Sequence, residues 1–78
     1  MDVRVRGEQA RALLEDPVLK EALDTIEADL LIRWGASAVG AVDEREACYA
    51  LHAGVQSLRA QLTAFWTAAK LEADRGKA

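Results

Sequence analysis

Apolar side chains recur at helical spacing along two sides of one long segment in the C-terminal half of the chain. Large side chains form one row, at alternating steps of three and four residues: Cys48, Leu51, Val55, Leu58, Leu62, Phe65 and Ala69. Mostly small side chains form the opposite row: Ala50, Ala53, Ser57, Ala60, Ala64, Thr67 and Leu71. Arg59 is the only charged residue between Ala47 and Ala69. Because a surface helix needs only one apolar side, the pattern predicts a helix that is contacted on two sides.

A shorter amphipathic helix is predicted from Pro17 to about Trp34. Its expected buried row recurs at helical spacing and consists of Leu19, Ala22, Leu23, Ile26 and Leu30. The opposite side is expected to be a solvated acidic face, formed by Glu21, Asp24, Thr25 and Glu27. Asp16 suits an N-cap and proline suits the first helical turn, so the chain should break or kink here, after a short helix over residues 7–15.

The segment between the two long helices is rich in small residues. Gly35 is expected to end the second helix in the left-handed conformation. Asp43 and Glu46 have the spacing of a capping box, which predicts that the third helix runs from Glu44 to about Asp74. These boundaries give a flexible tail over residues 1–6, one helical domain over residues 7–74 and a second tail over residues 75–78.

The predicted fold class is all-α, with the two long helices in an antiparallel hairpin and a short helix at the N-terminus. The third helix has more residues than the second, and each residue adds about 1.5 Å of length, so the second helix leaves the end of the third uncovered. The short first helix should cover that end. Leu13, Leu14 and Val18 would then lie beside Phe65 and Trp66. Nothing within the chain is left to cover the small-residue row.

The size of the chain favours association. A core built from 78 residues commonly needs disulfides, metals or oligomerisation for stability. One cysteine excludes an internal disulfide, and one cysteine with one histidine cannot fill a tetrahedral metal site. A two-fold dimer of hairpins, forming a four-helix bundle, is the simplest solution that remains. The predicted dimer or partner interface is the small-residue row, represented by Ala50, Ala53, Ser57, Ala60, Ala64 and Leu71.

No motif predicts a catalytic, cofactor-binding or metal site, so we expect no enzyme, no cofactor and no small-molecule substrate. Cys48 and His52 have the spacing of a thiolate–imidazole pair, but no orienting group or oxyanion site accompanies them, and a buried cysteine beside a half-buried histidine is the simpler interpretation. Trp34 and Tyr49 are candidate partner anchors, because both are expected near the same end of the hairpin.

Charge and hydropathy exclude further classes of function. A net charge of −3 and a pI of about 5.0 disfavour nucleic-acid binding, which needs a basic surface. Neither a signal peptide nor a membrane span is expected, since polar residues interrupt the apolar segments. The expected location is therefore the cytoplasm, with association with a virion as the alternative.

One stretch of the chain resembles a known group of proteins. Residues 6–23 contain Arg-Gly-x-x-Ala-x-x-Leu-Leu-x-x-Pro, followed by Glu-Ala, and further along Asp43-x-Arg45-Glu46 opens the long helix after Trp34. This order resembles small all-helical proteins encoded in bacteriophage and prophage genomes. The resemblance implies a role in virion assembly or host takeover, with no enzymatic residues. The alanine-rich, charge-poor third helix departs from that pattern.

Two functional hypotheses follow. The first is a non-enzymatic helical interaction module, derived from a phage or prophage, that acts as a homodimer in assembly or as an adaptor for a phage or host protein. The alternative is a small regulatory protein that binds nucleic acid or a regulator through its N-terminal arginines, Arg4, Arg6 and Arg11.

Overall fold

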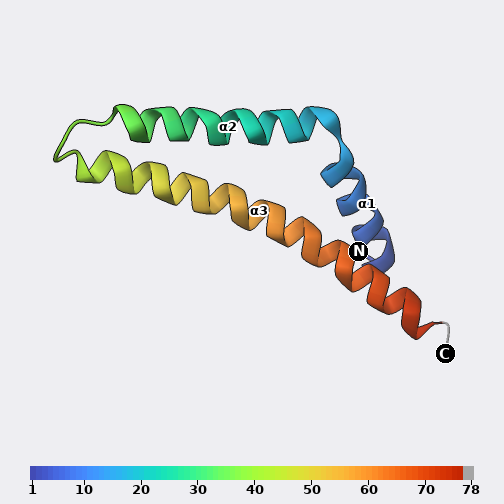
Figure 1. Cartoon of the computed structure of the whole chain (residues 1–78). Coiled ribbons are helices and arrows are strands. Elements are labelled where there is room, and N and C mark those ends of the chain that lie inside the picture. Colours follow the sequence, from blue (N-terminus) through green and yellow to red (C-terminus); the bar gives the residue numbers. More distant parts are fainter. Residues whose placement is uncertain (77–78) are drawn as a thin grey trace.

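The computed structural model describes residues 1–76, and three helices make up almost all of this range. They are α1 (Val3–Glu15), α2 (Pro17–Ala36) and α3 (Val42–Arg75). Figure 1 shows α2 and α3 side by side in opposite directions, while α1 turns away from the start of α2 and crosses α3 toward its C-terminal end. The all-α class expected from the sequence is confirmed.

The boundary between α1 and α2 is a break in the helix, formed by the predicted residues. The Asp16 carboxylate accepts a hydrogen bond from the Leu19 backbone N–H at 2.8 Å, and Pro17 occupies the first turn. Proline lacks the N–H that would continue α1, and the residue before it avoids helical geometry. Asp16 is extended, with φ −69° and ψ 119°, so the chain changes direction here.

The predicted start of the first helix is wrong. α1 begins at Val3 and not near Gly7, because the Asp2 carboxylate caps it by accepting hydrogen bonds from the N–H groups of Arg4 and Val5. The tail expected over residues 1–6 is therefore helical from Val3 onward. At the C-terminal end, Arg75 is still the last residue of α3, and residues 77–78 of the other expected tail lie outside the described residues.

The connection between α2 and α3 also differs from the sequence prediction. α3 begins at Val42 with no side-chain cap, so Asp43 lies in the first turn and does not form the expected capping box. The reason is a tight turn in which Gly40 adopts φ +91° and the Ala41 N–H donates to the Ala38 carbonyl at 3.0 Å. Gly35 remains helical inside α2, and the left-handed glycine of this connection is Gly40 instead.

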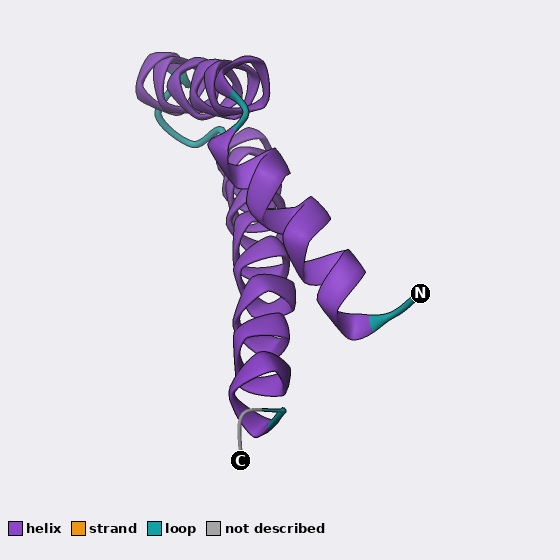
Figure 2. Ribbon diagram, turned by 90° about the vertical axis from the view of Figure 1, so that its right-hand side faces the viewer, coloured by secondary structure: helices purple, strands orange, loops and turns teal. Residues whose placement is uncertain are grey.

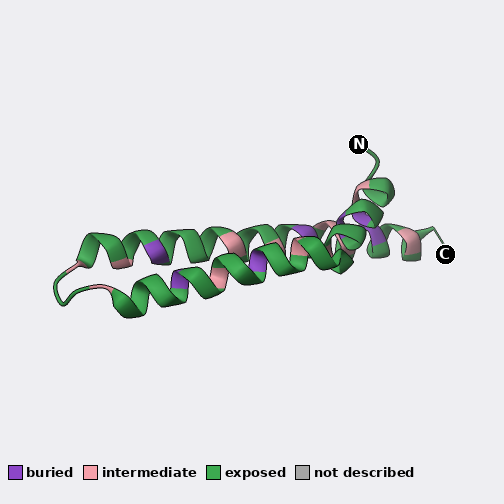
Figure 3. Ribbon diagram, turned by 90° about the horizontal axis from the view of Figure 1, so that it is seen from above, coloured by how far each residue is buried: buried purple, intermediate pink, exposed green. Residues whose placement is uncertain are grey.

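The core is small for the length of the chain. Its buried apolar residues are Ala10, Leu23, Leu30, Cys48, Leu62 and Ala69. Figure 3 shows them where α2 faces α3 and where α1 meets α3, with most of the remaining ribbon exposed. The molecule measures 59 × 22 × 18 Å, and its radius of gyration is 17.0 Å. A compact chain of this length would have a radius of gyration of about 11.5 Å, so the three helices form an elongated body.

α1 crosses α3 (Figures 1 and 2), and it packs on α3 more extensively than α2 does. Gly7 is buried there, and a Cβ atom added to it would lie 2.7 Å from the Phe65 carbonyl oxygen and would overlap the Ala69 methyl group. Ala10 is also buried in this contact face of α1. Beside it, the Arg6 guanidinium stacks on the Phe65 ring at 4.1 Å. Small side chains thus let the two backbones approach each other.

Candidate interaction surfaces

The small-residue row on α3 has no covering element in the described structure. All of its predicted interface residues are exposed: Ala50, Ala53, Ser57, Ala60, Ala64 and Leu71. Alanine and serine have high or moderate helix propensity but little apolar area, so leaving this row exposed to water costs a single chain little stability. The row is therefore available for a contact, and its small side chains do not by themselves specify one.

A second uncovered surface was not expected from the sequence. It is a groove of about 540 Å³ along one side of the seam between α2 and α3, here called the apolar groove. Its α2 wall contains Leu23, Ile26, Asp29, Leu30 and Arg33, and its α3 wall contains Ala50, Leu51, Gly54, Val55 and Leu58. Charged groups enter the lining only at Asp29 and Arg33.

The large-residue row of α3, which the sequence predicts to be covered by the other helices, is only partly covered in the structure. Leu51 and Leu58 remain 52% and 46% exposed, and Ile26 on α2 remains 45% exposed. The rest of the row is better covered, since Leu62 and Ala69 are buried where α1 and α2 reach α3. α1 packs on the C-terminal half of α3 only, so the N-terminal half of the row has α2 alone as its neighbour.

The buried row predicted for α2 is also only partly right. Leu23 and Leu30 are buried and Leu19 is half-buried, whereas Ala22 and Ile26 are exposed. Val18 is exposed as well, at 74%, and so it does not join the contact with the aromatic residues of α3 that the sequence suggested. One pair of helices can bury only the strip of each that faces the other, which is narrower than the apolar pattern.

A polar bridge crosses the opposite side of the seam between α2 and α3. Arg59 Nε donates to Glu27 Oε1 at 3.0 Å, and its Nη2 donates to Asp24 Oδ1 at 2.9 Å. Gln56 Nε2 donates to the same Glu27 oxygen at 3.3 Å. The face around Asp24 and Glu27, predicted to be merely solvated, therefore holds α2 to α3 on this side.

Arg59 is charged in this bridge, as an arginine side chain is at ordinary pH. Partial desolvation lowers the pKa of Arg59, but the hydrogen bonds to Asp24 and Glu27 and the negative charges of these carboxylates raise the pKa by more. The net effect is a pKa for Arg59 above the ordinary arginine value. The sole charge in the central part of α3 thus serves an intramolecular contact.

Trp34 and Tyr49 lie on opposite walls of a third surface, here called the aromatic groove. It has a volume of about 480 Å³ and lies on the same side of the seam as Glu27, near the loop that joins α2 to α3. Trp34 is 52% exposed and Tyr49 is 73% exposed, and Leu31 also lines this groove. The two candidate anchors therefore share one surface.

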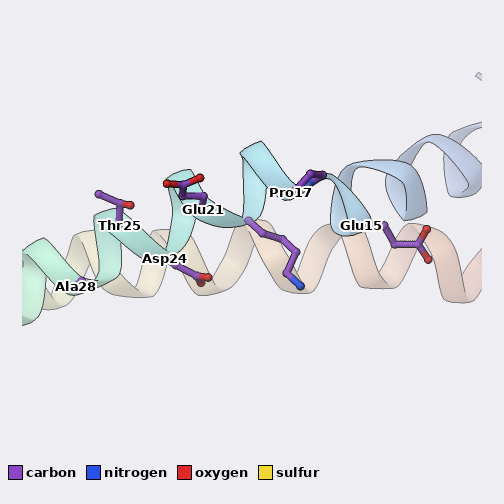
Figure 4. Close-up of a pocket in the computed structure, with 7 residues that line it drawn as sticks. Glu15, Pro17, Glu21, Asp24, Thr25 and Ala28 are labelled. Carbon is purple, nitrogen blue, oxygen red and sulfur yellow. The ribbon is translucent and has the colours of Figure 1, made fainter.

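The other candidate chemistry of the sequence does not converge on a site. Cys48 is buried and His52 is exposed, and both line the aromatic groove. In Figure 4, the carboxylates of Glu15, Glu21 and Asp24 are spread along an open depression at the α1–α2 junction and do not point at one position. Within residues 1–76, no group of three or more His, Cys, Asp or Glu side chains has the arrangement of a metal site.

The N-terminal arginines all contact other parts of the chain. Arg4 Nη2 donates to the Glu72 carbonyl at 3.4 Å, and Arg6 stacks on Phe65. Arg11 lies 5.2 Å from the centre of the Trp66 ring and forms ion pairs with Glu8 at 3.3 Å and Glu15 at 3.8 Å. These side chains fix α1 on α3 and do not form a free basic patch.

Across the helices of the described region, none combines the length and apolar character needed to cross a lipid bilayer. Comparison of the chain with protein-family models, with curated proteins and with solved structures gives no match.

Proposed function

We propose that the protein is a non-enzymatic helical interaction module that works as a homodimer, in assembly or as an adaptor. In this proposal the antiparallel pair of α2 and α3 associates with a second pair to give a four-helix bundle. The observation that carries the proposal is the large accessible surface of one chain, which includes many exposed large apolar side chains.

The accessible surface of the chain can be compared with that of compact proteins. One chain exposes 5714 Å². A compact monomer of 8.5 kDa would expose about 4,700 Å², so the excess is about 1,000 Å². Stable interfaces bury about 800 Å² on each partner, which is of the same size as this excess. One contact with a second chain would therefore bring the exposed surface to the range of a compact protein.

The alternative of nucleic-acid binding receives less support. The three arginines on which it depends contact α3 or neighbouring carboxylates. The net charge of −3 would also repel a phosphate backbone.

A role in virion assembly or as a phage adaptor is supported by the resemblance of residues 6–23 to phage and prophage proteins. The genes that neighbour the coding sequence test this role. Capsid, portal or terminase genes would favour assembly, and a metabolic operon would contradict it.

The dimer itself is tested by size-exclusion chromatography with light scattering, over a range of protein concentrations. The expected mass is about twice the 8.5 kDa of one chain. Added duplex DNA at low salt should leave the elution volume unchanged. A mass of one chain up to millimolar concentration would contradict the proposal, and a salt-sensitive complex with DNA would favour the alternative.

A further inference from the structure

We infer that the second copy docks in the apolar groove, across a two-fold axis, and that the small-residue row is at most the edge of this interface. The inference rests on the proposed homodimer and specifies which face forms it. Three features of the groove support it: its half-exposed large side chains, the small residues on its α3 wall, and the two charges on its α2 wall.

The first feature is apolar area that a second copy can cover. Ile26, Leu51 and Leu58 are each about half exposed, although every one of them belongs to a row that the periodicity of the sequence places in a core. The small-residue row offers mostly methyl groups, each of which contributes less on burial than a leucine or isoleucine side chain. Covering the groove therefore removes more apolar surface per contact than covering the row.

The second feature is the shape of the α3 wall. Ala50 and Gly54 lie one turn apart in the lining, and a Cβ atom added to Gly54 would meet nothing within 4 Å. A helix of a second copy can approach α3 closely at such residues and place its own large side chains against Leu51 and Leu58. Gly54 lowers the helix propensity of α3, and the space that a Cβ atom would occupy is open within one chain, so a helix of another chain can approach the α3 backbone closely here.

The third feature is self-complementary charge. Asp29 and Arg33 lie four residues apart on the α2 wall, both are exposed, and in the part of the chain that the structure describes no ion pair joins them. A two-fold axis that passes between them brings Asp29 of each copy opposite Arg33 of the other. One acid and one base on the same face thus form two equivalent ion pairs in a dimer. A partner of unrelated sequence would need matching charges of its own.

The face is tested with leucine variants matched on one helix. Leu58→Glu places a charge in the apolar groove, whereas Leu71→Glu places one on the small-residue row, at a leucine of similar exposure. Leu31→Glu serves as the control for the aromatic groove. Sedimentation equilibrium should show a dissociation constant raised at least about tenfold for Leu58→Glu, with less than about a threefold change for the other two variants. Circular dichroism verifies that each variant keeps its helices.

The symmetry is tested by exchanging the charges of the α2 wall. Asp29→Arg alone or Arg33→Asp alone sets like charges opposite each other in both pairs, and each variant should dimerise about threefold more weakly or worse at low salt. A mixture of the two single variants should form heterodimers in preference to either homodimer, and the doubly exchanged variant should recover the affinity of the wild type. This test holds even if Leu58→Glu fails to fold.

The outcomes separate this inference from the proposed function. A monomeric wild type would overturn both. A dimer that Leu71→Glu or Leu31→Glu dissociates while Leu58→Glu does not would overturn only the choice of the groove. Single charge variants that dimerise like the wild type, and that mix at random, would overturn the two-fold pairing across the groove.

Discussion

Replacing Gly7 by alanine tests the contact between α1 and α3, because the contact predicts a loss of stability where helix propensity alone predicts a gain. Gly7 lies inside α1, where helix propensity alone favours alanine by about 1 kcal/mol. In the folded chain, however, the new Cβ atom would lie 2.7 Å from the Phe65 carbonyl oxygen and would overlap the methyl group of Ala69. A backbone oxygen and a methyl group cannot rotate away, so α1 must move off α3.

The magnitude follows from the balance of these effects. Inserting a methyl group into a close-packed contact typically costs about 1–3 kcal/mol. Displacing α1 would also expose Ala10 and part of the surface of Phe65 that α1 now covers. After subtracting the gain in propensity, we expect Gly7→Ala to lower the free energy of unfolding by about 1–2 kcal/mol, which corresponds to a fall of about 4–16 °C in Tm for a domain of this size.

The assay is thermal and urea unfolding followed by far-UV circular dichroism, at one fixed protein concentration because dimerisation couples to stability. Gly35→Ala is the matched control: Gly35 is helical, and a Cβ atom there would meet nothing within 4 Å, so this variant should gain up to about 1 kcal/mol. Combining Gly7→Ala with Ala69→Gly should recover part of the loss. Stabilisation of the Gly7→Ala variant to the same extent as the control would refute the crossing of α1 and α3.

Three other substitutions test particular contacts by urea unfolding. Asp16→Ala removes the hydrogen bond to the Leu19 N–H and should lower stability by about 0.5–2 kcal/mol, and no change would mean that the cap does not form. Gly40→Ala forces a side chain into φ +91° and should destabilise the chain by about 1 kcal/mol or more, whereas a gain would show that the turn adopts another conformation. Leu62→Ala should lower stability by about 2–5 kcal/mol because Leu62 is buried, and a loss well under 1 kcal/mol would place it outside the core.

Local chemistry made parts of the fold predictable from the sequence. The Asp16-Pro17 boundary depends on a side-chain acceptor and a missing N–H, both of which are visible in two adjacent residues. The three-helix composition likewise follows from apolar spacing. By contrast, Gly40 and not Gly35 takes the left-handed conformation, because the length of the loop and the packing of the helix ends decide that choice.

The surfaces were less predictable because burial depends on where helices meet. The periodicity placed Leu51 and Leu58 in a core with α2, but it cannot show that α1 covers only the far end of α3. The sequence singles out Arg59 as the only charge in a long uncharged stretch. It does not show which carboxylates Arg59 pairs with, because these lie on α2 and are distant in sequence. Gly7 had no such signal, because the sequence placed it at the start of the first helix and not inside it, where it contacts α3.

Isotope-filtered nuclear Overhauser spectroscopy can show whether a second copy covers the apolar groove. A sample that mixes labelled and unlabelled chains reports only contacts between different chains. We predict intermolecular contacts from the methyl groups of Leu51, Leu58 and Ile26, which line the groove. A dimeric sample in which these methyl groups show no intermolecular contact, while those of the alanine row around Ala60 do, would show that the second copy docks on the small-residue row and not in the apolar groove.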